Sequence, residues 1–200
     1  MGKQRQFNEN NVLNQITECF WEHGYGATKV DKLAALTGLT KTSLYNAFGN
    51  KEAIFLKSLD YYLSNTYGDI IDQLDTRKSM TDNLDFLLKK IFLEIDIKQL
   101  NKGCMMTNSI LELASNELIL YAETTRRFQL IQNTIYAFFD EYVSNGRLAT
   151  SMNTQEISEV FSVFFQGLRV KSRVEKSPEA LYQPISSFIE LMKSLEKNKD

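Results

Sequence analysis

Apolar residues recur at helical spacing along most of the chain. The clearest run begins at Leu84 and continues at i+3, i+4, i+7, i+8 and i+11, which places these side chains on one face of a helix. Comparable stripes, bounded by capping residues or glycine, predict helices over residues 10–23, 28–37, 40–48, 50–74, 79–100, 104–114, 116–143, 154–168 and 177–195. Among the expected helix caps are Asn50, Ser79 and Thr154. No stretch alternates apolar and polar residues with a period of two. The pattern therefore predicts an all-α fold of about nine helices.

Two short apolar stripes separated by a glycine stand out within residues 28–48. Thr28 and Asp31 have the spacing of a helix cap and its return partner, and Thr40 can cap the second stripe. Between the stripes, Gly38 can take the positive φ that a tight turn requires. Leu44 falls on the side of the second helix that would pack against the first. This arrangement predicts a helix-turn-helix.

The outward face of the second helix carries hydrogen-bonding side chains. Lys41 and Tyr45 form one row at i, i+4, and Thr42 and Asn46 form another. Lys41 can donate to guanine, and Asn46 can pair with adenine through two hydrogen bonds. The methyl groups of Thr40 and Thr42 can contact thymine. A helix pair that serves only as a packing motif has no need of these residue types, so we expect this face to read double-stranded DNA in the major groove.

Four segments spanning residues 5–51 fit one known family of DNA-binding proteins. The segments RQFNENNVLNQI, FWEHGYGATKVDKLAALTGL, LTKTSLYNAF and AFGNK together resemble the TetR/AcrR family of transcriptional regulators. Further along, GCMMTNSILELASN and GLRVKSRVEKSPEAL resemble segments of one subgroup of that family. The resemblance implies a three-helix DNA-binding domain over residues 1–50 and a helical ligand-binding and dimerisation domain over residues 51–200. It also implies a repressor that binds an inverted-repeat operator as a homodimer and is released by a small molecule.

The resemblance also extends the set of expected DNA contacts. Tyr45 and Lys51 match family positions whose hydroxyl and ammonium groups contact phosphates. Thr28 and Lys29 are expected at a helix N-terminus, which favours phosphate as well. Lys3 and Arg5 belong either to a basic arm that contacts the DNA or to a solvated tail. The expected DNA-binding residues are Thr28, Lys29, Thr40, Lys41, Thr42, Ser43, Tyr45, Asn46 and Lys51.

The two helices expected after residue 154 have apolar faces too wide to be covered from one side only. Paired with a second copy of themselves across a two-fold axis, they would form a four-helix dimer interface, which is where dimers form in the family that this chain resembles. Pro184 is expected either to kink the last helix or to delay its start. The expected interface residues are Val160, Phe161, Phe164, Phe165, Gly167, Leu168, Ile185, Phe188, Ile189 and Met192.

Aromatic and sulfur-containing side chains in the second half of the chain are candidates for an effector site. The resemblance implies a pocket for a small apolar or aromatic effector, with Phe86, Phe92, Cys104, Met106, Tyr121, Phe128 and Tyr136 as candidate residues. Cys104 follows Gly103 at an expected helix N-terminus, where a thiolate is favoured. Two roles are therefore open for Cys104: an inert, partly buried thiol, or a sensor of electrophiles or oxidants in a thiol-based repressor.

Composition narrows the remaining functions. The formal net charge of −2 divides into +1 over residues 1–60 and −3 over residues 61–200, so global charge does not decide whether the chain binds DNA. With two cysteines and one histidine, we expect no zinc site, no other metal and no cofactor. No apolar stretch reaches membrane-spanning length and no export signal is evident, so we expect a cytoplasmic protein that does not bind a membrane.

Two other classes of protein remain as alternatives. An enzyme is not expected, because no nucleophile, base and acid set, glycine-rich phosphate loop or clustered carboxylates are present. A helical adaptor that binds another protein through its apolar C-terminal faces would lack a preference for DNA. A homodimer that binds its own operator would instead support the regulator.

Overall fold

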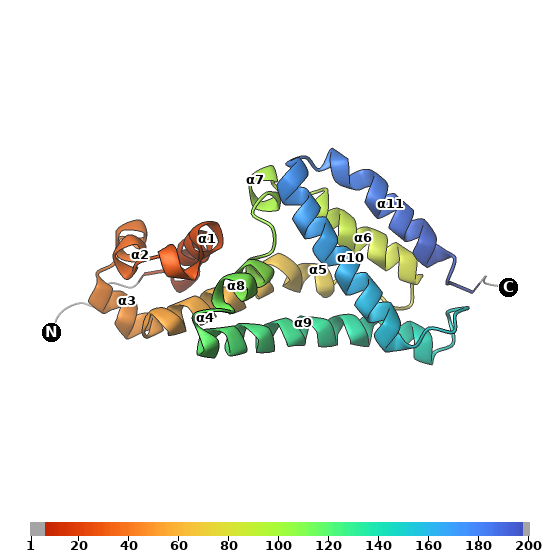
Figure 1. The fold of residues 1–200 in the computed structure, drawn as a ribbon, viewed down its shortest axis with the longest axis horizontal. Coiled ribbons are helices and arrows are strands. Elements are labelled where there is room, and N and C mark those ends of the chain that lie inside the picture. The colour runs from red at the N-terminus through yellow and green to blue at the C-terminus, as the bar shows by residue number, and fades with distance from the viewer. Residues whose placement is uncertain (1–6, 198–200) are drawn as a thin grey trace. The chain divides into compact units, whose positions relative to one another are not determined.

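The computed structural model describes residues 7–197, and every regular element in that range is helical (Figure 1). An isolated β-bridge joins Leu148 to Glu196. The predicted all-α fold class is confirmed. The helices are α1 Glu9–Ala27, α2 Val30–Thr37, α3 Lys41–Phe48, α4 Lys51–Leu63, the π-helix η1 Ser64–Gly68, α5 Asp69–Ile71, α6 Met80–Phe92, α7 Ile97–Leu100, α8 Met105–Leu113, α9 Leu118–Ser144, α10 Thr154–Glu175 and α11 Glu179–Lys193.

The helices group into two compact units. The amino-terminal unit contains the described residues up to Asn65 together with Met105–Arg127, and the carboxy-terminal unit contains Thr66–Cys104 together with the described residues from Phe128 onward. The sequence led us to divide the chain after residue 50. In the structure α4 and α8 pack against α1, and the start of α9 belongs to the same compact unit, which is a division that local sequence patterns do not reveal.

Side-chain caps start three of the first four helices. Asn8 accepts a hydrogen bond from the Asn11 amide at 3.1 Å and starts α1. As expected, Thr40 caps α3 and Asn50 caps α4. The cap expected at Thr28 is wrong, because α2 begins after Lys29, which makes no side-chain cap.

The reason for this difference lies at Gly24, where α1 departs from helical geometry with φ 77°. The Thr28 side chain is fully buried and its hydroxyl donates to the Gly24 carbonyl at 2.7 Å. The hydroxyl therefore serves the end of α1, and α2 begins without a side-chain cap.

Aromatic rings hold α1 and α4 together in the core of the amino-terminal unit. Phe55 of α4 packs edge-on against Phe20 and Tyr25 of α1, with ring centroids 5.1 and 5.0 Å apart. Farther along the same pair of helices, Trp21 packs against Tyr62 at 4.9 Å. The helix that precedes the predicted helix-turn-helix is thereby fixed to the helix that follows it.

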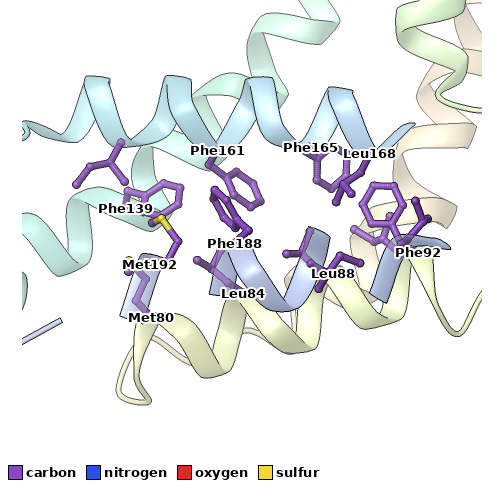
Figure 2. Close-up of a cluster of buried hydrophobic side chains, with 14 of the residues drawn as sticks. Met80, Leu84, Leu88, Phe92, Phe139, Phe161, Phe165, Leu168, Phe188 and Met192 are labelled. Carbon is purple, nitrogen blue, oxygen red and sulfur yellow. The ribbon is translucent and has the colours of Figure 1, made fainter. Parts of the chain in front are cut away.

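The core of the carboxy-terminal unit is formed by α6, α10, α11 and the second half of α9 (Figure 2). Phe161 of α10 contacts rings from two neighbouring helices, with centroid distances of 5.5 Å to Phe139 and 6.1 Å to Phe188. Phe92 of α6 packs edge-on against Phe165 at 5.1 Å. Figure 2 shows these side chains pointing towards one another between α6, α10 and α11.

Several helix ends in the second half differ from the prediction. The helix expected over residues 79–100 ends at Phe92, and Asp96 caps the separate helix α7 by accepting a hydrogen bond from the Lys98 amide at 2.7 Å. Asn153, not Thr154, caps α10, because its side chain and that of Glu156 form a reciprocal capping box. The remaining difference is that α11 begins at Glu179 and runs through Pro184 without interruption.

Candidate nucleic-acid interface

Helices α2 and α3 and the turn between them form the predicted helix-turn-helix. Gly38 ends α2 in the left-handed conformation, with φ 69° and ψ 12°, so it takes the backbone geometry that the sequence required of it. Leu33 of α2 and Leu44 of α3 are fully buried, and Phe48 is 3% exposed. Burial of these residues leaves the opposite face of α3 for solvent or a partner.

The side chains predicted to read bases lie on that opposite face. Lys41, Thr42 and Asn46 are exposed, and Tyr45 is 44% exposed although it is a large ring. The four side chains occupy two successive turns of α3, as the i, i+4 rows predicted. The protein's own body therefore does not cover this face.

Lys41 has an intramolecular partner that the sequence did not indicate. Its ammonium lies 2.7 Å from a carboxylate oxygen of Asp31 in the first turn of α2. The hydrogen bond to Asp31 raises the pKa of Lys41 above its usual value. Both side chains are exposed, so the pair can separate at little cost when a DNA base or phosphate offers a competing acceptor.

The hydroxyl groups of Thr40 and Ser43 are directed towards each other. Their oxygens are 2.9 Å apart, and the Thr40 oxygen also accepts the Ser43 amide at 3.1 Å. Thr40 is thus engaged as the helix cap, while its exposed position leaves its methyl group free for an apolar contact.

Lys51 lies at the start of α4, next to an aromatic ring of α1. Its ammonium is 4.1 Å from the centroid of the Tyr25 ring, a cation–π contact. Partial burial lowers the pKa of Lys51 below its usual value. Lys29, by contrast, is exposed at the beginning of α2.

Two groups of expected contacts need a different assignment. Thr28 has no accessible side chain, because it is fully buried and bonded to Gly24. Lys3 and Arg5 lie outside the described residues.

Sequence reasoning also missed Lys57, whose ammonium donates to the carbonyl of Ala47 at 3.4 Å near the end of α3. No signal in the sequence indicated this contact, because Lys57 belongs to α4 and lies nine residues past the end of α3.

The candidate effector residues do not gather in a single unit. Met106 and Tyr121 belong to the amino-terminal unit, while Phe86, Phe92, Cys104, Phe128 and Tyr136 belong to the carboxy-terminal unit. Phe92 and Met106 are fully buried, and Cys104 is 3% exposed. Tyr136 is 41% exposed, and Phe86, Tyr121 and Phe128 are half-buried.

Most of the residues expected at a dimer interface instead form the protomer's own core. Six of them are buried within the carboxy-terminal unit: Phe161, Phe165, Leu168, Ile185, Phe188 and Met192. Phe164 and Ile189 are half-buried, and Phe164 stacks on Phe188 with centroids 3.9 Å apart. Only Val160 and Gly167 of the expected set are exposed. The wide apolar face of α10 is thus largely covered by α6, α9 and α11.

A second, narrower apolar stripe remains uncovered on α10. Val160, Val163, Gly167, Val170 and Val174 recur at alternating intervals of three and four residues, which is the a/d pattern of a helix-pairing seam. The four valines are between 46% and 74% exposed. A methyl group built on Gly167 would meet no heavy atom within 4 Å. This stripe, and not the buried phenylalanines, is available to a partner.

Within residues 7–197, no helix combines the length and the hydropathy that crossing a lipid bilayer would require.

Comparison with known proteins agrees with this geometry. Residues 12–57 match the family model "Bacterial regulatory proteins, tetR family". The chain is 25% identical to the HTH-type transcriptional repressor ComR of Escherichia coli (strain K12) over 197 residues, covering 98% of this chain and 94% of ComR.

Solved structures share the whole fold. A TetR transcriptional regulator from Chloroflexus aurantiacus J-10-FL superposes with a TM-score of 0.76 at 16% identity, covering 96% of this chain and 98% of that one. A cysteine mutant of the TetR family regulator CifR, complexed with 26-bp double-strand operator DNA, superposes with a TM-score of 0.74 at 22% identity over 94% and 98% of the two chains. Residues 12–57 thus match the DNA-binding domain of the TetR family, and the chain as a whole shares the fold of solved TetR-family regulators.

Proposed function

We propose that this regulator is a repressor that binds an inverted-repeat operator as a homodimer and is released by a small apolar or aromatic molecule. ComR is named a repressor, and the related IcaR of Staphylococcus aureus (strain Newman), 22% identical over 187 residues, is named a negative transcriptional regulator. These names support repression and not activation of transcription.

The observation that carries the proposal is the exposed polar face of α3. Thr42, Tyr45 and Asn46 are exposed on a helix whose other face is fixed by buried Leu44 and Phe48. In this geometry Asn46 and Lys41 would contact base edges, while Lys29, Tyr45 and Lys51 would contact phosphates. The phosphate contacts would set the register of α3 in the major groove, and the base contacts would provide sequence preference.

The apolar stripe of α10 supports the homodimer. Two copies related by a two-fold axis would pair their valines and allow close approach at Gly167, with Tyr182 and Leu191 of α11 as further exposed apolar side chains. Two recognition helices about 34 Å apart would then enter successive major grooves.

Release by an effector in the helical region after residue 50 completes the proposal. Of the candidates, Phe86, Tyr121 and Phe128 are half-buried, so their side chains have both apolar surroundings and remaining surface for a ligand. The burial of Cys104 weighs against the alternative of a thiol sensor, because oxidants and electrophiles react fastest with accessible thiolates.

Selection of binding sites from random-sequence duplex DNA tests the central claim. We expect the selected sequences to share an inverted repeat, and we expect Asn46→Ala to relax the preference at one position in each half-site. Equal losses for Asn46→Ala on selected and random DNA would overturn the readout role. Absence of any enriched sequence would overturn operator binding and favour the adaptor. Screening small aromatic compounds for release of the selected duplex tests the effector.

A further inference from the structure

A single carboxylate of α8 binds the segment that connects α1 to α2. This segment, residues 24–28, is called the joint between α1 and α2. The two oxygens of Glu112 accept hydrogen bonds from the successive backbone amides of Tyr25, at 2.9 Å, and Gly26, at 2.7 Å. Eighty-six residues or more separate donor and acceptor in the sequence. This contact is thus a specific tertiary link and not a local helix cap.

The backbone at the end of α1 is shaped for this carboxylate. Gly24 has φ 77° and ψ 174°, which turns the chain out of the helix just before the two donor amides. Successive amides in such a turn form a concavity that binds anions. A side chain at Gly24 would place its Cβ 2.5 Å from an oxygen of Glu112, so only glycine allows the carboxylate to approach this closely.

A residue of the proposed DNA-binding set also contacts this joint. Glu112 accepts a hydrogen bond from the amide of Tyr25, and the ammonium of Lys51 lies 4.1 Å from the centroid of the Tyr25 ring. Four residues beyond Gly24, Thr28 is bonded to the Gly24 carbonyl, and α2 begins immediately afterwards. Any shift of the joint would therefore be passed to α2 and to α3, which packs on it.

Helix α8 is well placed along the chain to deliver such a shift. It begins at Met105, directly after Cys104, where the chain passes from the carboxy-terminal unit into the amino-terminal unit. Glu112 follows seven residues later, about 10 Å along the helix axis. A displacement of α8 by about 1 Å would lengthen both hydrogen bonds beyond the normal range, so the link would be lost over a short distance.

We propose that Glu112 is a positioning residue for operator binding, holding the joint between α1 and α2 in the conformation that presents α3 to DNA. Movement of α8 would release the joint and lower the affinity for DNA. This inference rests on the proposed function and adds to it the contact through which α8 controls the helix-turn-helix.

The test compares Glu112→Gln with Glu22→Gln, which removes the same charge from an exposed carboxylate of α1. The glutamine keeps one acceptor oxygen but turns an N–H group towards the second amide, which breaks that hydrogen bond. The probes are the duplex selected from random DNA and an unselected duplex of equal length. The other readouts are the thermal midpoint and the hydrogen exchange of the Tyr25 and Gly26 amides.

We expect Glu112→Gln to bind the selected duplex about fivefold or more weakly than Glu22→Gln, at a temperature at which both variants are folded. Faster exchange of the two amides should accompany this loss. Equal operator affinity for the two variants, with any difference confined to the thermal midpoint, would overturn the inference and leave Glu112 a stabilising role only. Failure of the unaltered protein to prefer any duplex would overturn the proposed function instead.

Gly26→Ala provides a second test that keeps the charge, which is useful if Glu112→Gln does not fold. Its Cβ would lie 3.2 Å from an oxygen of Glu112, close enough to push the carboxylate away, and Gly26 is not in the left-handed region. Gly68→Ala, where the added Cβ meets nothing within 4 Å, is the control. We expect only Gly26→Ala to weaken binding to the selected duplex, and equal binding by both variants would contradict the inference.

Discussion

The polar side chains expected to contact DNA differ in the partners that they must give up to do so. Asn46 and Thr42 are exposed, whereas Lys41 is held by Asp31 at 2.7 Å and Lys51 rests on the Tyr25 ring. A lysine with an existing partner must exchange that partner for a base or phosphate. We therefore expect the lysines on this surface to contribute unequally to DNA binding, although they carry the same charge.

Asp31→Asn should strengthen binding to DNA of any sequence. The substitution frees the Lys41 ammonium and removes a negative charge near the DNA-facing surface, so we expect affinity for a random-sequence duplex to rise about threefold at low salt. Fluorescence anisotropy with a labelled duplex measures the change.

A double-variant cycle separates the two causes of that gain. In a Lys41→Met background, the general effect of charge remains, but the release of Lys41 does not. We therefore expect Asp31→Asn to gain less affinity in that background. An identical gain in both backgrounds would show that Asp31 does not restrain Lys41.

At the scale of helices, the sequence predicted where chain segments become helical better than which residue begins them. Thr40, Asn50 and Ser79 were expected as caps and are caps, since no neighbouring residue competes with them. At residues 153 and 154 two capping residues stand side by side, and the reciprocal bond with Glu156 decides in favour of Asn153. Thr28 was expected to cap α2, but its side chain is buried and bonded at the end of α1. Local spacing cannot reveal this burial.

The two apolar faces of α10 show a related limit. The sequence indicated that this helix is too apolar to be covered from one side. It did not indicate that the phenylalanines would face the protomer's core and the valines would face away from it. That choice depends on how α6 and α11 pack against α10, so the outward stripe could be identified only from the structure.

Val163→Glu should weaken the proposed homodimer while leaving the protomer folded. Val163 is 74% exposed, so the carboxylate is solvated in the monomer, whereas two copies at a two-fold interface would bring like charges together. We expect the dimer dissociation constant to rise about tenfold or more by analytical ultracentrifugation. Ile119→Glu, at a residue that is 79% exposed on α9, should leave that constant unchanged. Equal effects of the two substitutions would argue against the stripe.

Phe161→Ala should act on the fold and not primarily on assembly. Its ring is 2% exposed and contacts Phe139, Phe165 and Phe188 (Figure 2). Truncation of such a buried ring leaves a cavity, so we expect the free energy of unfolding to fall by about 3–5 kcal/mol. Denaturant unfolding measures this loss. A stability change that disappears on dilution to the monomer would instead place Phe161 at the interface.

For the whole molecule, the fold class and the helix-turn-helix followed from helical periodicity, caps and Gly38, because each depends on residues close together in the sequence. The grouping of α8 with the first helices did not follow. The contacts of α8 include the hydrogen bonds from the amides of Tyr25 and Gly26 to Glu112, and a single exposed glutamate carries no sequence signal for such a distant partner. Long-range placement of polar contacts was the part that sequence reasoning could not supply.

The symmetry of the proposed homodimer leads to a prediction about the DNA itself. If two α3 helices about 34 Å apart read two half-sites on one face of the duplex, the spacing of the half-sites is fixed by the protein. Inserting about 5 bp at the centre of the selected repeat rotates one half-site to the opposite face, whereas inserting about 10 bp restores the face but lengthens the separation by a full turn. We expect both insertions to weaken binding, because a dimer built for one half-site spacing would contact only one half-site of either expanded repeat. Binding to a single half-site should be as weak as binding to either expanded repeat. If affinity, measured by gel shift on these duplexes, does not depend on the spacing, the protomers bind DNA independently and the two-fold arrangement is wrong.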